Sequence, residues 1–310
     1  MSPEMASPLN AATATQLLKN DQLMTDVELR QDYCDFCGIP GTFYSRASDH
    51  SILRCKRCNL IWTDPLLSRR PSFTGEETYK ANELSQKARF REQLRSFLRN
   101  TGVEDPRQLR LLEIGPGLGF FLDVCEESGI AAEGCDLADH AIRYANQKRE
   151  RVRKGTLDSH YAGAGFDAIF AFNLIEHLPH PKQFLEDAAK ALRTGGTLVL
   201  ETPVQEGLFH RLARLGDKFT GGRINLYGMR PSGHVYKFSK KTFRRLAADG
   251  QWRVVSQKNI SSPWGEIWGN SDAVEMDHKG LYRFALPAAF SVANATGQGN
   301  RVFVMLRKES

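Results

Sequence analysis

The sequence predicts an α/β protein built on an open, doubly wound sheet of seven strands, with a small cysteine-rich module at its N-terminus. From residue 109 onwards, short apolar segments alternate with amphipathic ones, which is the pattern of parallel strands and their crossover helices. The first of these segments runs directly into a glycine-rich turn at Gly115. Upstream of it, four cysteines form two C-x-x-C pairs. These observations indicate one large core and one small attached unit.

Length and composition are consistent with this division and exclude several classes of protein. The chain has 310 residues, of which 41% are hydrophobic, and this is enough to bury one large core. No window approaches the about 18 apolar residues of a membrane span, and residues 1–18 lack the basic start and apolar run of a signal peptide. We therefore predict a cytoplasmic protein without membrane association, beginning with a flexible tail over residues 1–28.

The cysteine-rich unit is predicted to be a zinc ribbon over residues 29–66, since two C-x-x-C turns complete the tetrahedral thiolate set that zinc prefers. The predicted metal ligands are Cys34, Cys37, Cys55 and Cys58. Gly38 and Asn59 follow the two pairs, where the turn favours residues that tolerate a positive φ. Four thiolates leave no position for water, so the zinc is expected to be structural. Disulfides are the alternative, and they would need an oxidising compartment.

A charged segment with helical periodicity follows the ribbon. Four cations recur at intervals of four and so share one helix face: Lys87, Arg91, Arg95 and Arg99. This basic stripe has two interpretations, a surface for phosphates of RNA or of a nucleotide-linked substrate, or an ordinary solvated face. The net charge of +6 is modest for a dedicated nucleic-acid binder and does not decide between them.

The large core begins at the first apolar segment, and its strands are separated by helices. The predicted strands lie near residues 109–114, 130–136, 151–155, 166–172, 196–202, 252–258 and 301–307. Pro181 to Leu192 reads as an amphipathic helix that begins on proline and is stopped by Gly195. Cys125 and Cys135 lie in apolar segments and are predicted to pack as small hydrophobic residues. Ligands of such sheets bind outside the carboxyl ends of the strands, where we expect the chemistry.

The glycine turn is spaced G-x-G-x-G, whereas the dinucleotide fingerprint is G-x-G-x-x-G. Glu113, two residues before the first glycine, would place a carboxylate near the ligand, which suits a cationic amine better than a pyrophosphate. Asp136 ends the second predicted strand, a position from which a carboxylate can bind ribose hydroxyls. The alternative role for Asp136, capping the helix that begins near Ala138, is compatible with the first. The pattern favours a nucleotide that carries an amino acid.

In this order the segments resemble the class I S-adenosylmethionine-dependent methyltransferases, whose core is a Rossmann-like sheet. The resemblance covers Leu111 to Val255 and a last strand at Arg301 to Lys308, within a core predicted to span residues 109–310. It implies that the methionine end is held by Glu113, Gly115, Gly117 and Gly119, the ribose side by Asp136 and Leu137, and the adenine edge by Leu157 or Asp158, with Asn173 beside the sulfonium.

The resemblance also assigns parts to the segments outside this sheet. Residues 67–108 become a helical linker and cofactor lid, with the Tyr79 hydroxyl reaching toward the active site. Two long insertions, 203–234 and 261–300, lie at the rim of the expected crevice and are interpreted as lids or substrate pockets.

Methyl transfer needs an aligned nucleophile and, for many acceptors, a base. His177 and His234 are the candidates, because neutral imidazole can take a proton near pH 7. Glu176 and His177 form a pair that recurs in methyltransferases similar to those of the ubiquinone pathway, some of which bind a divalent metal there. Asn173 replaces the first acid of that pattern, so we interpret the pair as catalytic without metal or as structural. Which histidine is the base stays open.

His234 lies just before a predicted helix at Lys240 to Asp249. A zinc ribbon, a class I core and a histidine at this place are similar to the C-methyltransferases of deoxysugar biosynthesis. Those enzymes carry a tyrosine and a glutamate just ahead of the histidine, where this chain has Pro231 and Gly233, and they continue into a further domain. The similarity implies the architecture and the possible base but leaves the sugar substrate open.

Three function classes follow from these patterns. The first is a methyltransferase acting on oxygen or carbon of a small molecule, such as a sugar nucleotide or secondary metabolite. The second is an RNA methyltransferase that uses the ribbon and the basic stripe to bind RNA. The third is a non-catalytic binding module on the same fold. The expected cofactors are S-adenosylmethionine and structural zinc, while the methyl acceptor and the oligomeric state are not determined by the sequence.

Overall fold

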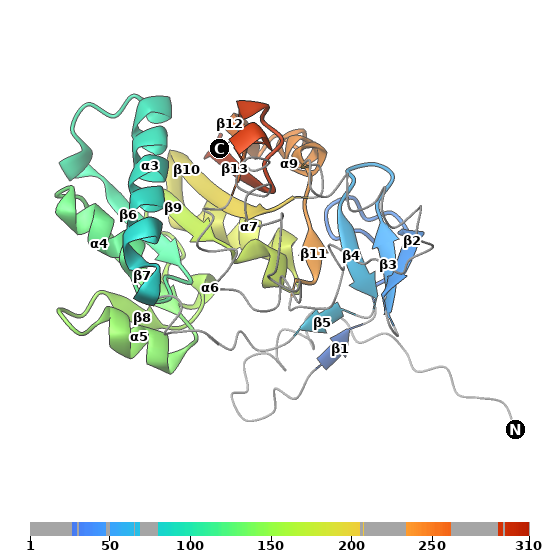
Figure 1. Ribbon diagram of the computed structural model, residues 1–310, viewed down its shortest axis with the longest axis horizontal. Coiled ribbons are helices and arrows are strands. Elements are labelled where there is room, and N and C mark those ends of the chain that lie inside the picture. Colours follow the sequence, from blue (N-terminus) through green and yellow to red (C-terminus); the bar gives the residue numbers. More distant parts are fainter. Residues whose placement is uncertain are drawn as a thin grey trace, which may run out of the picture.

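The computed structural model describes residues 27–29, 31–47, 50–64, 66–68, 80–204, 207, 234–261, 291–293 and 295–309. In these ranges a large sheet with helices on both faces forms the centre of the molecule, and a smaller sheet lies at the end away from helices α3 and α4 (Figure 1). The predicted α/β architecture with a small N-terminal unit is confirmed. In the described part of the chain, no helix is both long and apolar enough to span a bilayer.

The large sheet contains the seven predicted strands in the order β12-β13-β10-β9-β6-β7-β8. Their bounds are β6 Arg110–Ile114, β7 Ala131–Asp136, β8 Val152–Lys154, β9 Phe166–Phe172, β10 Leu192–Pro203, β12 Trp252–Ile260 and β13 Arg301–Lys308. Strands β8, β7, β6, β9 and β10 run parallel, and β13 is antiparallel to both of its neighbours. The strand order reverses at β6, which lies between β7 and β9, so a ligand crevice is expected at its carboxyl end.

The helices cover both faces of this sheet. Their bounds are α3 Glu83–Thr101, α4 Phe120–Glu127, α5 Asp139–Ala145, α6 Leu157–His160, α7 Pro181–Ala191 and α9 Lys240–Ala247, with the short 3-10 turns η1 Pro106–Gln108 and η2 Ile175–His177. Strand β9 shows how the layers divide: Phe170 and Phe172 pack with the aromatic residues of α3 and α4, whereas Ile169 and Ala171 pack with α7 and the cysteine module. Alternate side chains of a buried strand therefore serve two cores.

One boundary differs from the prediction. Helix α7 ends at Ala191, and Leu192 is already extended, with φ −81° and ψ 144°, and pairs with Phe166. The Leu192 side chain is 2% exposed, so it gains more from joining the sheet and its core than from one more helical residue. Gly195, expected to stop the helix, instead lies at a register irregularity inside β10, where it adopts φ 76°.

The small sheet holds three strands of the cysteine-rich unit and one strand from the core. β2 (Thr42–Ala47), β3 (His50–Arg54) and β4 (Ile61–Asp64) form an antiparallel meander, and β11 (Tyr236–Lys237) adds itself to the β4 edge. Separately, β1 (Val27–Leu29) pairs with β5 (Leu66–Ser68). The ribbon was predicted as a separate unit, but it shares a sheet with a core segment that follows it by some 170 residues in the chain. This shared sheet fixes the ribbon against the core.

Candidate active site and cysteine centre

The glycine turn after β6 has the backbone that its spacing predicts. Gly115, Gly117 and Gly119 adopt φ of 70°, 53° and 79°, a region that residues with a Cβ rarely enter. A Cβ at Gly119 would lie 3.0 Å from the Cβ of Ala145 and 3.1 Å from Nη2 of Arg151. The third glycine is therefore explained by close packing of α4 against α5 and Arg151, and the first two by the conformation of the turn.

Asp136 connects the end of β7 to this turn. One carboxylate oxygen accepts a hydrogen bond from the Gly117 amide at 3.3 Å, and the other accepts from the Ala138 amide at 2.9 Å, just before α5. The predicted capping role is not present as such: the N-cap of α5 is Ala138, which has no side-chain capping bond, and Asp136 bonds the amide of Ala138 itself. The carboxylate also faces the glycine turn. Leu137, the next residue, is 54% exposed although it is apolar. An exposed leucine beside a carboxylate suits a ligand with a sugar and an apolar ring, which is what the sequence predicts here.

The two predicted adenine-side residues occupy different environments. Leu157 is 4% exposed and belongs to the core. Asp158 is exposed on α6, and its carboxylate accepts a hydrogen bond from Thr156 Oγ1 at 2.5 Å. Asp158 is thus the member of the pair with an accessible polar group, and its role toward a ligand stays a prediction.

Glu113 is buried at the end of β6, with 2% of its surface exposed. Burial, and then repulsion from the Asp136 carboxylate, raise the pKa of Glu113 to about 8. Its Oε2 atom has no hydrogen-bond partner among the described residues. An unpartnered buried carboxyl oxygen next to the glycine turn fits the predicted cationic amine, because such a donor would satisfy the oxygen and favour its ionised form.

Asn173 directly follows β9 and adopts the left-handed region, at φ 53°, where asparagine is better tolerated than most residues. Its Oδ1 accepts a hydrogen bond from Nη1 of Arg301. The same guanidinium forms an ion pair with Glu201, 2.9 Å from its Oε1 atom. Glu201 is fully buried near the end of β10 and also accepts hydrogen bonds from Arg89, at 2.7 Å, and from Gln93. This network was missed from the sequence, although an acid inside the apolar β10 segment is a signal for it. It holds α3 over the carboxyl ends of β9 and β10.

The structure brings Glu176, His177 and His234 together. One carboxylate oxygen of Glu176 and one ring nitrogen of each histidine lie within 4.8 Å of one another. The two imidazole rings are in contact edge to face, with centroids 4.7 Å apart. Glu176 is 1% exposed; its Oε2 accepts from Thr202 Oγ1 at 2.8 Å, and its Oε1 has no partner within the described ranges. Burial raises the pKa of Glu176. This cluster lies at the carboxyl ends of β9 and β10. Its three side chains are close enough for a proton to pass from one to another.

His234 is the more strongly perturbed histidine. Burial, followed by the positive charges of His177, Lys237 and Arg301, lowers its pKa to about 3. Burial also lowers the pKa of Lys237 to about 8. The His234 imidazole is therefore neutral at pH 7, but with this pKa it is a weak base, and it would become a better proton acceptor when an anion beside it offsets the nearby positive charges. The surrounding cations would favour an anion formed on a nearby acceptor.

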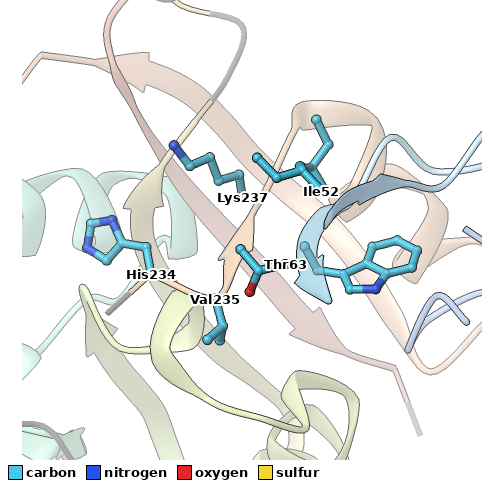
Figure 2. A pocket seen from close by; sticks show the side chains of 7 residues that line it. Ile52, Thr63, His234, Val235 and Lys237 are labelled. Carbon is cyan, nitrogen blue, oxygen red and sulfur yellow. The ribbon is translucent and has the colours of Figure 1, made fainter. Parts of the chain in front are cut away.

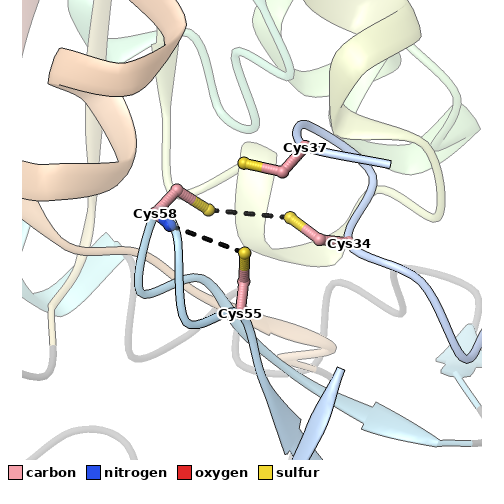
Figure 3. Close-up of side chains that lie close together, drawn as sticks. All are labelled: Cys34, Cys37, Cys55 and Cys58. Carbon is pink, nitrogen blue, oxygen red and sulfur yellow. Dashed lines mark hydrogen bonds between the residues drawn. The ribbon is translucent and has the colours of Figure 1, made fainter. Parts of the chain in front are cut away.

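The four cysteine sulfurs converge, as Figure 3 shows, and all lie within 4.8 Å of one another. Sγ of Cys34 is 3.6 Å from Sγ of Cys58, much longer than the about 2.05 Å of a disulfide and close to the about 3.8 Å edge of a zinc–thiolate tetrahedron. Gly38 and Asn59 adopt φ of 61° and 64° and donate backbone hydrogen bonds to the first cysteine of each pair, both at 2.9 Å. The two predicted turns are thus present, and their geometry fits zinc.

The basic stripe is neutralised by carboxylates of this chain. Each cation is paired as follows: Lys87 with Glu83 and Asp123, Arg91 with Glu127, and both Arg95 and Arg99 with Glu92. Lys87 is 9% exposed and so lies within the fold. Its exposed members, Arg91, Arg95 and Arg99, are ion-paired as expected of a solvated face, and binding of phosphates by the stripe stays a prediction.

Some predicted features fall outside the described residues. These include Tyr79, most of the insertion 203–234 and most of the insertion 261–300. Their roles stay predictions.

Comparison with known proteins identifies the family. The model of a family described as a methyltransferase domain matches residues 85–257, more than half of the chain. The chain belongs to this methyltransferase family. The match begins within α3, includes the glycine turn, Asp136 and the Glu176–His177 turn, and ends within β12. The class I core predicted from the sequence is confirmed, whereas no finding supports the narrower similarity to deoxysugar C-methyltransferases.

Curated relatives of this methyltransferase include two named ubiquinone biosynthesis O-methyltransferase. The protein of Parvibaculum lavamentivorans is 29% identical over 184 residues, covering 56% of this chain and 70% of the relative. That of Paracidovorax citrulli is 26% identical over 126 residues, covering 37% of this chain and 52% of the relative. The match to the second relative therefore spans about half of its length.

Solved structures share the fold. A SAM-dependent methyltransferase from Archaeoglobus fulgidus matches with a TM-score of 0.50 at 16% identity, covering 77% of this chain and 100% of that one. A chain from the complex of the Haloferax volcanii Trm112 methyltransferase activator with a methyltransferase matches with a TM-score of 0.53 at 14% identity, covering 78% and 100%. At these identities the likeness establishes the architecture alone.

Proposed function

We propose that this methyltransferase transfers the methyl group of S-adenosylmethionine to an oxygen atom of a small molecule. The observation that carries the proposal is that one edge of the sheet holds both parts of the site, a first part suited to the cofactor and a second part suited to the methyl acceptor. The glycine turn and Asp136 lie at the carboxyl ends of β6 and β7, and the His177–His234 pair lies beside the ends of β9 and β10. A nucleotide and an acceptor bound there would meet at the switch point of the sheet.

The residues of the first part fit the cofactor. Gly115 and Gly117 leave two positions of the turn without a side chain. Asp136 offers carboxylate oxygens to ribose hydroxyls, and the unpartnered Oε2 of Glu113 suits the methionine amine. When bound, S-adenosylmethionine supplies a methyl carbon activated by the sulfonium. Asn173 is held by Arg301 at the junction with the second part, where its amide can orient the methionine end.

The second part provides a base. The His234 ring contacts that of His177, so the pair supplies imidazole nitrogens that can take the proton of an acceptor hydroxyl. His234 alone is a weak base, and the oxyanion left beside it would raise its low pKa. Lys237 and Arg301 would stabilise the oxyanion that forms as the proton leaves. The O-methyltransferase names of the two relatives also favour an oxygen acceptor. A carbon acceptor with an acidic proton, as in a sugar nucleotide, would use the same base and is the alternative.

Structural zinc at the four cysteines is part of this proposal. The thiol geometry fits a closed tetrahedral site, which has no open position for substrate or water. The cysteine centre therefore has no chemical step to perform. An RNA substrate is disfavoured because the basic stripe is paired with acids of the chain.

Calorimetric titration of the purified chain with S-adenosylhomocysteine tests the cofactor assignment first. Micromolar binding that survives high salt supports the proposal, and acceptors can then be screened in the order phenols, nucleotide sugars and RNA. No binding to folded protein would overturn it and favour a binding module. Methyl transfer only to RNA, lost as salt rises, would favour the RNA methyltransferase instead.

A further inference from the structure

The segment that carries His234 is held between the ribbon and the core. On one side, β11 pairs antiparallel with ribbon strand β4, with Tyr236 opposite Trp62, and the Thr63 amide donates to the Val235 carbonyl at 3.2 Å. On the other side, the Val235 amide donates to the Glu176 carbonyl at 2.9 Å. The backbone next to His234 therefore bridges the ribbon edge and the turn that carries His177. Val235 is thus hydrogen-bonded both to the ribbon edge and to Glu176, and each of these contacts lies next to one of the two histidines in the chain.

The second cysteine turn is bonded directly to helix α9, which follows β11. Ser239 and Thr242 form a reciprocal capping box at the start of α9, and Thr242 Oγ1 donates to the Cys58 carbonyl at 3.0 Å. Ser239 Oγ lies 3.3 Å from the same carbonyl. Both hydroxyl residues are buried, at 2% and 0% exposure. A cap normally serves its own helix, but this one also holds a cysteine of the metal centre.

The first cysteine turn is bonded to the start of helix α7, which follows the turn that carries His177. Asp35, between Cys34 and Cys37, accepts a hydrogen bond from the Lys182 amide at 2.7 Å. Lys182 is the second residue of α7, which begins four residues after His177. Each cysteine turn thus bonds to the start of one helix, and these two helices follow, in the chain, the segments that carry His177 and His234.

The space between ribbon and core is closed by side chains from both. A small cavity there is lined by Ile52, Ile61, Trp62, Thr63, His234, Val235 and Lys237. Figure 2 shows Ile52 on the ribbon side of this cavity and His234 on the core side. Trp62 and Tyr236 are each 1% exposed, so the contact is packed. The ribbon forms a wall of the space beside His234.

We propose that the four-cysteine module positions the His177–His234 pair, with Thr242 and Asp35 as the positioning residues that transmit its structure to the active site. This inference rests on the proposed function for its catalytic meaning, but the placement it describes is independent of the acceptor. The glycine turn and Asp136 make no such contact with the module among the described hydrogen bonds. Disturbing the module should therefore displace the histidines and leave cofactor binding intact.

The test uses the full, zinc-loaded chain labelled at histidine and observed by NMR. Thr242→Val removes the hydroxyl that reaches Cys58 with little change in shape, and Thr101→Val is the matched control, since Thr101 donates to the Phe97 carbonyl at the far end of α3. We expect the imidazole resonances of His177 and His234 to shift in Thr242→Val and to be unchanged in Thr101→Val. The conservative Thr242→Ser should restore them. The affinity for S-adenosylhomocysteine should stay within about twofold in all three.

Asp35→Asn provides a second route, through α7, and should shift the same resonances because it weakens the acceptor of the Lys182 amide. Once an acceptor is known, both variants should lower kcat by about 10-fold to 100-fold and leave KM for S-adenosylmethionine unchanged. Unmoved histidine resonances in both folded variants would overturn the inference. Failure of the wild type to bind S-adenosylhomocysteine would instead count against the proposed function, so the two failures are distinguishable.

Discussion

The two halves of the proposed active site are built in different ways. The cofactor half comes from one continuous stretch, in which β6, the glycine turn, β7 and α5 follow one another along the chain. The acceptor half is assembled from three distant segments: the ribbon, the turn at Glu176–His177 and the strand after His234. Local assembly leaves a pattern in the sequence, whereas assembly from distant segments depends on contacts that only the folded chain shows. The first half should therefore tolerate damage to the ribbon, and the second should not.

The largest expected effect is that of Cys55→Ser. Loss of one thiolate opens the closed four-sulfur site, so the variant should lose its zinc and the ribbon should unfold, as in small domains whose folding energy comes from the metal. Elemental analysis should find one zinc in the wild type and none in the variant. Cys135→Ser is the control, because Cys135 is equally buried but lies in β7; it should lower the melting temperature and keep the metal. A folded wild type without metal would contradict the zinc assignment.

The next effect is a pH-dependent stability that belongs to the cofactor half. Glu113 has a pKa of about 8 in the folded chain, above its ordinary value near 4.5, so between these pH values the native state holds a proton that the unfolded state has released. The Glu113 contribution to the free energy of unfolding of the cofactor-free protein should therefore fall by a few kcal/mol, about 1.4 for each pH unit, as pH rises from 4.5 to 8. The lowered pKa of His234 acts with the opposite sign below pH 6.5, so the difference between the wild type and Glu113→Gln is the quantity that isolates this contribution. Glu113→Gln should remove this decline. Denaturant titrations across this range check it, and parallel curves for the two proteins would contradict the assignment.

A smaller effect is expected for Asp136→Ala. The loss of its carboxylate should weaken binding of S-adenosylhomocysteine by about 1 to 3 kcal/mol, the cost of unpaired hydroxyls on the ligand, and leave the histidine resonances in place. Calorimetry measures the affinity. Asp139→Ala is the matched control, an exposed aspartate three residues away that pairs with Lys154, and it should bind normally. Equal affinity in the wild type and the Asp136 variant would remove Asp136 from the site.

The contrast between local and distant assembly also explains which features could be predicted from the sequence. The seven strands, the glycine turn, Asp136 and the positive φ of Gly38 and Asn59 are set by neighbours in the chain, and all were predicted. Strand β11 was not, because two residues carry no periodicity and their partner is a strand in the ribbon. The contact between His177 and His234 was left open for the same reason. Both candidates were found from their chemistry, but only the fold shows that their rings are in contact.

The smallest expected effect distinguishes a small-molecule methyltransferase from an RNA methyltransferase. Arg95 is the most exposed cation of the basic stripe, with a side chain 64% exposed and 3.8 Å from Glu92. An exposed pair of this kind adds less than about 1 kcal/mol, so Arg95→Ala should change the unfolding midpoint only slightly. If the stripe is a solvated face, the variant should also keep the wild-type rate of methyl transfer at every salt concentration. A loss of activity toward RNA, with a weaker dependence on salt, would show that the stripe binds phosphates despite its acidic partners.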